Sequence, residues 1–448
     1  MSSIQEFYSR ELPTDYYEGL LADLSKLNEE LHAFNALNMS LRSGYPFSAK
    51  DNICAMGLEC TASSKVLKGY VPPFNATAVE RMLGNGFGLL GKTNMDEFGF
   101  GTFGINSDPI ARNPFNSDYV AGGSSSGAAI ATALLKYHVA IAESTGGSIS
   151  APAAFCGVVG FTPTYGMISR YGLIDYANSL DKIGVMARTA TDVRQAFDTV
   201  RGRDRYDTTC TDARPRGGAA KRVLVIDQLM KHVDDRVRSA FDRLLGKLEN
   251  LGYAVEHVSL EGIDVAVQAY YVISMAECST NLAKFTGFKY GYQLREFSKG
   301  YNEFFTEARD AFGQEAKRRI ILGTFVRSAS VRSRYYSRAL RIRAMLTHRL
   351  SELMARGLIL SPTMPIVTPK ISDVESLGPV QAYAMDILTV PANLCGFPHA
   401  SFPYDYADGM PLGAQIVGTH FDDYSVIDFV SAWENIFDYR FKYNVGAL

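Results

Sequence analysis

Residues 121–157 read AGGSSSGAAIATALLKYHVAIAESTGGSISAPAAFCG, and this stretch decides the fold and the chemistry of the chain. It contains two clusters of small residues, GGSSSG at 122–127 and TGGSI at 145–149. Glycines beside a serine permit positive φ and a close approach of the backbone to a ligand. They also leave successive N–H groups free to point into one space, as an oxyanion hole requires. Either cluster alone would indicate only a tight turn. Residues 128–137 predict a short apolar helix and 139–142 a strand, which could bring the two clusters together.

The stretch resembles the amidase signature family, whose hydrolases use a Ser–Ser–Lys triad in place of Ser–His–Asp. The resemblance implies that Ser148 is the nucleophile and that Ser124 is the bridging serine, which the family usually places on a cis peptide bond. The interval between them, 148 − 124 = 24 residues, is the family's own. The family's lysine lies upstream, where a strand ends in a segment such as KDN. This chain has FSAKDN at 47–52, so the resemblance assigns the lysine to Lys50.

Two positions depart from the family pattern around the nucleophile, which is Asp–Thr–Gly–Gly–Ser–Ile–Arg. Ser144 stands in place of the Asp, and Ser150 stands in place of the Arg. Both charges are replaced together by neutral side chains. We interpret the change as the substitution of a structural pair rather than the loss of the site.

Composition restricts the class of protein. The chain has 448 residues, of which 47% are hydrophobic and 21% charged, with a formal net charge of −2. This length fits one large α/β domain, and the near-neutral charge gives no case for direct binding of nucleic acid or a membrane surface. Six cysteines without metal-binding spacing favour a reduced, cytoplasmic setting. We find no signal peptide and no apolar run near the ~20 residues of a membrane span.

Strand and helix patterns alternate along the whole chain. A single helix is predicted over 15–37, and further helices are predicted over 77–82, 189–200, from 234 and through most of 265–350. Strands are predicted over 88–91, 158–165, 223–226, 253–260 and 358–363, and an exposed loop over 202–221. This order predicts an α/β fold, with one large mixed sheet covered by helices on both faces. We expect 1–448 to be a single amidase-signature domain, with a helical segment at about 1–40 and the catalytic core at about 45–200. The remainder completes the sheet and the substrate pocket.

A serine nucleophile needs a base. The chain has seven histidines, so counting residues leaves a Ser–His–Asp triad open. None of them lies in a recognisable motif, and His138 in an apolar run is typical of a core or helix-end residue. The histidines are at positions 32, 138, 232, 257, 348, 399 and 420.

Lys50 is the stronger candidate. Beside apolar Phe47 and Ile53 its amine could be desolvated, which would lower its pKa and supply a neutral base. The alternative is that Lys50 forms a surface ion pair with the adjacent Asp51, and the family resemblance favours the base. By that resemblance Ser124 relays the proton between Lys50 and the nucleophile. The N–H groups of Thr145, Gly146, Gly147 and Ser148 are then the expected oxyanion hole.

Three further segments resemble one branch of the family, the A subunits of glutamyl-tRNA(Gln) amidotransferases. They are KTNMDEFG at 92–99, EAKRRIILGTF at 315–325 and QAYAMD at 381–386. The resemblance implies that Arg319 binds the α-carboxylate of glutamine and Asp386 its α-ammonium. A guanidinium matches a carboxylate bidentately, and a carboxylate matches an ammonium. Without the resemblance, Arg319 would be read as one of several basic residues on a helix and Asp386 as a helix cap.

This resemblance implies a glutaminase that supplies ammonia to its partners, the amidotransferase B and C subunits. In the family, the B subunit binds Glu-tRNA(Gln) and uses ATP and Mg²⁺, and the small C subunit wraps the glutaminase. For this chain the resemblance implies no cofactor and no metal, and the sequence contains no phosphate loop. Two alternatives are a free-standing amidase acting on a small amide, and a scaffold protein with a decayed site. Arg319 with Asp386 argues against the first, and Lys50, Ser124 and Ser148 argue against the second.

Overall fold

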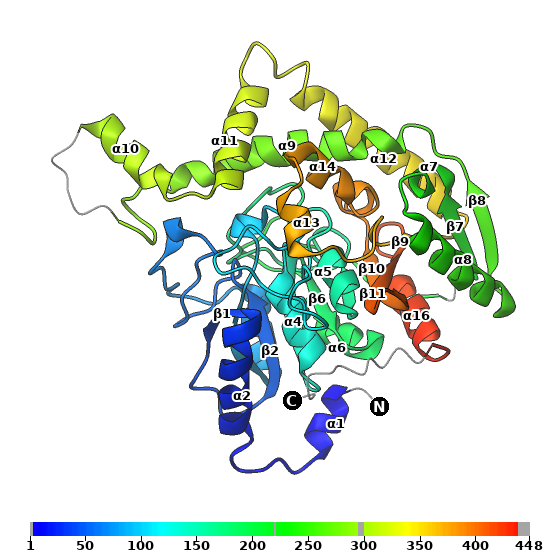
Figure 1. The fold of residues 1–448 in the computed structure, drawn as a ribbon, viewed down its shortest axis with the longest axis horizontal. Helices are drawn as coiled ribbons and strands as arrows, with labels where there is room; N and C mark the ends of the chain where they lie inside the picture. The colour runs from blue at the N-terminus through cyan, green and yellow to red at the C-terminus, as the bar shows by residue number, and fades with distance from the viewer. Residues whose placement is uncertain (1–2, 219–220, 294–299, 438–448) are drawn as a thin grey trace.

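The computed structural model describes residues 3–218, 221–293 and 300–437. Helices and strands alternate along these ranges, as the sequence predicts (Figure 1). The strands are β1 (Phe34–Leu37), β2 (Tyr45–Lys50), β3 (Phe87–Thr93), β4 (Val139–Ser144), β5 (Val159–Thr162), β6 (Lys182–Ala187), β7 (Arg222–Ile226), β8 (Ala254–Val258), β9 (Leu358–Pro362), β10 (His399–Ala407) and β11 (Met410–Val417). The helices are α1 (Ser3–Ser9), α2 (Tyr16–Leu31), α3 (Thr77–Gly84), α4 (Ser126–Leu134), α5 (Ser150–Cys156), α6 (Ala190–Val200), α7 (Asp227–Met230), α8 (Asp235–Asn250), α9 (Ala266–Asn281), α10 (Tyr301–Asp310), α11 (Gln314–Arg327), α12 (Tyr336–Met354), α13 (Ile371–Glu375), α14 (Pro379–Ala384), α15 (Val390–Leu394) and α16 (Asp423–Glu434).

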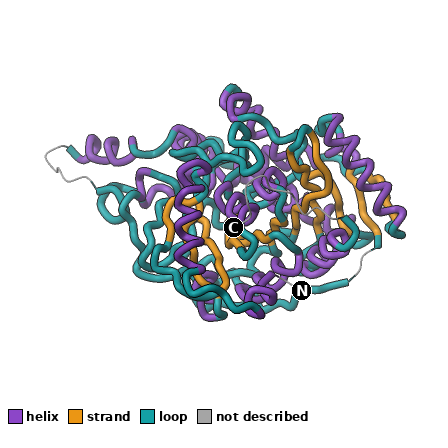
Figure 2. Tube along the Cα trace, turned by 60° about the horizontal axis from the view of Figure 1, so that its bottom comes forward, coloured by secondary structure: helices purple, strands orange, loops and turns teal. Residues whose placement is uncertain are grey.

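All eleven strands of the described ranges belong to one mixed sheet, in the order β1-β3-β2-β4-β6-β5-β10-β11-β9-β7-β8. Helices lie on both sides of it, as the tube view shows (Figure 2). The prediction of one large mixed sheet covered on both faces is therefore confirmed. No helix of these ranges combines the length and the apolar character needed to cross a membrane.

The alternation of side chains along β4 shows how the two faces are covered. Val139 and Ile141 belong to the larger core cluster, which also contains the buried side chains of α3 and α6. Ala140 and Ala142 belong to a second cluster, with the buried side chains of α2 and α4. A strand directs successive side chains to opposite faces, so an apolar run of this kind marks a strand that is buried on both faces.

The centre of the sheet positions the two parts of the candidate site. Strands β2 and β4 are parallel neighbours, with Ala49 opposite Ile141. Lys50 is the last residue of β2, and the TGGSI turn follows directly after β4. The carboxyl ends of parallel strands meet at one edge of a sheet, where α/β proteins commonly bind their ligands. The strand order thus brings the lysine and the second serine cluster to the same edge.

The helix predicted over 15–37 is wrong in its last six residues, 32–37. Helix α2 ends at Leu31, because His32 takes a left-handed conformation with φ 52° and donates its N–H to the carbonyl of Asn28. Residues 34–37 form β1, which pairs antiparallel with β3. The apolar side chain of Phe34 fits the helical spacing of the preceding leucines, but it packs into the second core cluster from a strand. Tertiary pairing overrides the local pattern here.

The prediction that 265–350 is mostly helical is confirmed, although residues 294–299 lie outside the described ranges. Helix α9 packs against both α11 and α12, and the three lie together along one side of the molecule (Figure 1). Helix α9 also contacts α15, which follows the QAYAMD segment. This layer brings the second half of the chain over the serine clusters of the first half.

Candidate active site

Lys50 is completely enclosed, with 0% of its surface exposed. Its amine donates to the Ser124 hydroxyl at 2.7 Å. It also donates to the backbone carbonyl and to the carboxylate Oε2 of Glu143, both at 2.9 Å. Burial lowers the pKa of Lys50, and the Glu143 carboxylate opposes this effect. The prediction of a desolvated lysine is confirmed, but its enclosure includes a charged partner as well as apolar neighbours.

The alternative of a surface ion pair with Asp51 is wrong. The Asp51 carboxylate is buried and turns away from Lys50, accepting hydrogen bonds from Asn35 and Thr61. The more buried histidines form their hydrogen bonds outside the two serine clusters: His138 with Thr132 and Ser48, and His399 and His420 with backbone carbonyls. His138 is a core residue, as predicted, and burial lowers its pKa to about 3.

Ser124 lies in a loop that packs tightly against the helix after the second cluster. The Gly123–Ser124 peptide bond is cis, which matches the feature implied for the bridging serine. Gly122 has φ +81°, and a Cβ there would lie 2.7 Å from the Pro152 Cα. Only glycine tolerates both this conformation and this close approach. The N–H of Ser125 donates to the Ser148 carbonyl at 3.2 Å. The two serine clusters are therefore joined, as the sequence predicts.

Ser148 is held in the turn between β4 and α5, and 5% of its surface is exposed. Its hydroxyl forms no hydrogen bond to any described residue, so the last link of a Lys–Ser–Ser relay is open here. Catalytic hydrogen bonds are often loose without substrate and tighten when it binds. The N–H groups of Gly146, Gly147 and Ser148 are likewise unbonded within the described ranges. Unpaired N–H donors beside a free hydroxyl are what an acyl-transfer site requires.

Arg319 and Asp386 are both buried, with 3% and 6% of their surfaces exposed. The Arg319 guanidinium donates to Glu315 at 2.8 Å and to the Tyr176 hydroxyl. The Asp386 carboxylate accepts from the Tyr271 hydroxyl at 2.5 Å and from Thr102 at 2.9 Å. Burial raises the pKa of Asp386 to about 6. Neither residue is the exposed helix residue or simple cap that the pattern alone would suggest.

Two adjacent tyrosines of α9 connect these residues to the nucleophile turn. The Tyr270 hydroxyl lies 2.7 Å from Thr145 Oγ1. Tyr271 binds Asp386 through its hydroxyl, and the Arg319 guanidinium lies 5.4 Å from the centre of its ring. The structure therefore brings the predicted catalytic and substrate-binding residues into one region.

Sequence analysis missed these tyrosines and Glu143. The region 265–350 is rich in tyrosine and arginine, but the sequence does not indicate which of them face the site. Glu143 gives a clearer signal, because a charged residue near the end of a strand buried on both faces needs a partner.

The departures at positions 144 and 150 leave no charge behind. The Ser144 hydroxyl donates to the Gly146 carbonyl at 3.1 Å. The Ser150 hydroxyl is buried and has no partner among the described residues. Neither serine forms a hydrogen bond to Lys50 or Ser124, and the Lys50–Ser124 hydrogen bond is present with both serines in place.

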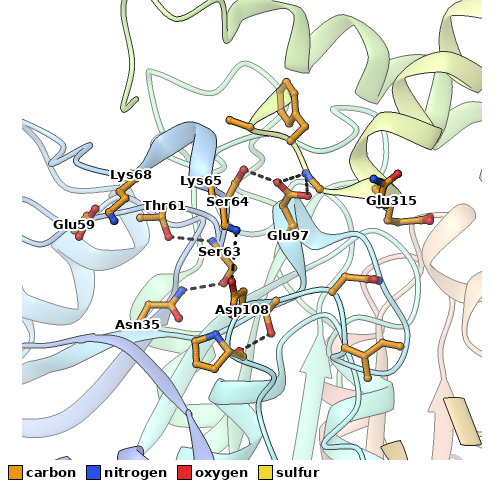
Figure 3. Close-up of a pocket in the computed structure, with 18 of the residues that line it drawn as sticks. Asn35, Glu59, Thr61, Ser63, Ser64, Lys65, Lys68, Glu97, Asp108 and Glu315 are labelled. Carbon is orange, nitrogen blue, oxygen red and sulfur yellow. Dashed lines mark hydrogen bonds and ion pairs between the residues drawn. The ribbon is translucent and has the colours of Figure 1, made fainter. Parts of the chain in front are cut away.

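A pocket of about 720 Å³ opens beside the helix that carries Arg319 (Figure 3). Glu97 joins two of its walls, accepting from the Ser64 hydroxyl at 2.6 Å and from the Gly313 N–H at 3.0 Å. Glu315, which binds Arg319, lies at its edge. Ser148 is not among the lining residues, so this pocket borders the site without containing the serine. Within the described ranges, no three His, Cys, Asp or Glu side chains are grouped so as to hold a metal ion.

Comparison with known proteins identifies relatives along nearly the whole chain. The model of the amidase family matches residues 16–427. A protein of Symbiobacterium thermophilum, named as the A subunit of glutamyl-tRNA(Gln) amidotransferase, is 41% identical over 406 residues, which cover 88% of this chain and 83% of that protein. The protein of the same name from Halobacterium salinarum is 43% identical, covering 87% and 95%.

Solved structures agree. The crystal structure of the glutamyl-tRNA(Gln) amidotransferase A subunit from Thermotoga maritima superposes with a TM-score of 0.81 at 33% identity, covering 96% of this chain and 92% of that one. A 6-aminohexanoate cyclic dimer hydrolase superposes with a TM-score of 0.84 at 22% identity, covering 100% and 99%. The second likeness concerns the fold alone.

Proposed function

The chain belongs to the amidase family, and from this membership we propose that it is the glutamine-hydrolysing A subunit of a glutamyl-tRNA(Gln) amidotransferase. The similarity to A subunits covers most of this chain and of its relatives. One observation supports glutamine as the substrate. The turn that holds Ser148 is connected through Tyr270 and Tyr271 to a buried arginine and a buried aspartate. A generic amidase for small neutral amides has no need of such a pair.

The proposed chemistry begins at Lys50. As the neutral amine, it accepts the proton of the Ser124 hydroxyl, while Ser124 accepts the proton of Ser148. The Ser148 oxygen then forms a bond to the carboxamide carbon, and the carbonyl electron pair moves onto oxygen. The N–H groups of the turn, from Thr145 to Ser148, hold this oxyanion. The leaving nitrogen takes a proton back through Ser124 and departs as ammonia. Water then hydrolyses the acyl-enzyme to glutamate.

The proposed substrate contacts use the two buried charges. Arg319 directs one N–H to Glu315 and one to Tyr176, and its other N–H groups suit the α-carboxylate of glutamine. Asp386 suits the α-ammonium. Both contact Tyr271, so the two charged ends of an amino acid would lie across that ring. The side-chain amide is then left free to reach Ser148.

The proposed assembly follows the branch of the family. Ammonia passes to the B subunit, which binds Glu-tRNA(Gln), and the C subunit completes a heterotrimer. The B subunit uses ATP and Mg²⁺, and no step on this chain requires them. The six cysteines of this chain are all buried and unpaired in the structure, which suits the cytoplasmic setting that we propose.

The decisive experiment is to co-express the chain with the B and C subunits. Glutamine hydrolysis and glutamine-dependent amidation of Glu-tRNA(Gln) would then be measured together. We expect both activities, with glutamine preferred over small neutral amides. A free-standing amidase would instead hydrolyse a small amide without any partner and show no preference for glutamine.

A further inference from the structure

Glu143 is the buried carboxylate that contacts the lysine of the proposed relay. Its Oε2 lies 2.9 Å from the Lys50 amine and also accepts from the Asn52 side chain at 3.1 Å. An ammonium has three N–H donors. In this structure Lys50 directs one to Ser124 and the other two to the carbonyl and the carboxylate of Glu143. Glu143 therefore supplies two of the three contacts that fix the amine.

We propose that Glu143 is a positioning residue of the relay, which holds the Lys50 amine against Ser124 and sets the pH above which Lys50 can accept a proton. This role rests on the proposed function, because it assumes that Lys50 is the base. It is distinct from the roles of Ser148, Ser124 and Lys50, since Glu143 acts on the reaction only through Lys50.

Two opposing effects act on the pKa of the Lys50 amine. Complete burial favours neutral Lys50, because a charge is costly to remove from water. A carboxylate at hydrogen-bonding distance favours the ammonium. The balance decides how much neutral amine is present at a given pH, and removing the carboxylate charge shifts the balance toward the neutral base.

Other charged groups face this pair from neighbouring elements. Asp96 follows β3 and Asp181 precedes β6, and both raise the pKa of Lys50 through space. Asp96 is bound by the N–H groups of residues 104 and 106. Burial, and secondly the charge of Glu143, raises the pKa of Asp181 well above its usual range. The Lys92 amine binds the carbonyl of Lys50 at 2.9 Å and makes no contact with its amine.

The pair is also tightly enclosed. A Cβ on Gly99 would lie 3.3 Å from Glu143 Oε2 and 3.6 Å from Ser124 Oγ. The second carboxylate oxygen of Glu143 is buried and has no partner among the described residues. Such an enclosed carboxylate is screened little by solvent, so its charge acts on Lys50 at nearly full strength.

The test is Glu143→Gln in the full chain, co-expressed with its partner subunits. Glutamine retains an oxygen that can accept from Lys50 but carries no charge. The probe is phenylmethanesulfonyl fluoride, a small reagent that sulfonylates activated serines. The rate of Ser148 sulfonylation is measured from pH 5 to pH 10, alongside the rate of glutamine hydrolysis, and Ser148→Ala confirms the labelled residue.

We expect the acidic limb of both pH–rate profiles to move to lower pH by about one to three pH units in Glu143→Gln, with a plateau rate within about tenfold of wild type. Glu143→Ala, which also loses the contact, should lower the plateau further.

Asp423→Asn is the matched control. Asp423 is another buried carboxylate near a buried lysine, Lys182, but it binds Thr164 and, in the described part of the chain, forms no hydrogen bond to Lys50 or to either serine cluster. Its profile should coincide with that of the wild type, and thermal melting identifies variants that are merely unfolded.

An acidic limb that stays in place in Glu143→Gln, with activity lowered equally at every pH, would overturn the inference while leaving the glutaminase assignment intact. A shifted sulfonylation profile in a protein that does not hydrolyse glutamine would support the inference and reject the proposed substrate. A wild type that is neither labelled nor able to hydrolyse glutamine at any pH would overturn the inference, because Lys50 would then activate no serine.

Discussion

The Lys50 amine lies 2.7 Å from the Ser124 hydroxyl, although the two residues are 74 positions apart in the sequence. Both side chains are completely buried. Lys50 is fixed by the end of β2, and Ser124 by the glycine loop that packs against Pro152. The contact therefore depends on the sheet order and on glycine at position 122.

Ser148→Ala removes the group that forms the acyl-enzyme. We expect glutamine hydrolysis to fall by on the order of 10⁴ or more. Amidation of Glu-tRNA(Gln) from free ammonia should survive, because the B subunit performs it. Both rates are measured on the purified complex. Glutaminase activity within tenfold of wild type would show that Ser148 is not the nucleophile.

Lys50→Arg tests the base. Burial lowers the pKa of Lys50, so neutral amine is present at a lower pH than the ~10.4 of a free lysine would allow. Activity should accordingly rise with pH through an apparent pKa below that value. Arginine keeps its proton at any usable pH, and the variant should be nearly inactive. Robust turnover by the arginine variant would show that Lys50 is not the base, and the histidines would become the candidates for that role.

Arg319→Ala and Asp386→Ala test the substrate. A charged hydrogen bond lost at a buried site costs about 1.5–3 kcal/mol, or roughly a tenfold to hundredfold loss in kcat/KM for glutamine. Hydrolysis of a small neutral amide should scarcely change, because it makes neither contact. The comparison is made on both substrates with the same enzyme preparation. Equal losses on the two substrates would indicate a structural role for both residues.

The pKa of Asp386, about 6, gives a separate pH dependence. Below that pH the carboxyl group is neutral and cannot pair with the α-ammonium, whereas above it the carboxylate is charged. The ratio of kcat/KM for glutamine to that for a neutral amide should therefore fall as pH falls through about 6. Taking this ratio cancels the contribution of Lys50, which affects both substrates. In Asp386→Ala the ratio should be flat with pH, and a falling ratio in that variant would contradict the assignment.

Gly122→Ala tests the close approach of the two serine clusters. A Cβ there would lie 2.7 Å from the Pro152 Cα. Gly57 is a matched control, because it has the same φ of +81° and nothing lies within 4 Å of its Cβ position. Gly57→Ala should cost about 1–2 kcal/mol of folding free energy for the left-handed conformation, and Gly122→Ala about 1–3 kcal/mol more for overlap. Urea unfolding of the full chain measures both. Equal losses of folding free energy in the two variants would mean that neighbouring residues move to relieve the overlap at Gly122 without a cost in stability.

Most regular elements could be predicted from the sequence, because their patterns are local. The capped helix predicted over 189–200 is α6, whose Thr189 side chain accepts from the Asp192 N–H. The helix predicted from Asp234 is α8. The prediction for residues 34–37 is wrong, because four residues do not distinguish a helical from an extended period. Strands β6, β10 and β11 were not predicted, although β10 and β11 lie near the middle of the sheet. Each of these three strands contains glycine or proline (Gly184, Pro403, and Pro411 with Gly413), which interrupts the apolar run that marks a buried strand.

The sequence by itself determined the class of fold and the identities of the candidate residues. Glycine–serine turns, a lysine at a strand end and segments that resemble the family are properties of neighbouring residues, so a linear pattern retains them. Only the tertiary structure decided what surrounds those residues. Lys50 is paired with Glu143 rather than Asp51, and Asp386 with Tyr271. Burial and long-range contacts set the charge of a side chain, and these depend on which strands and helices become neighbours.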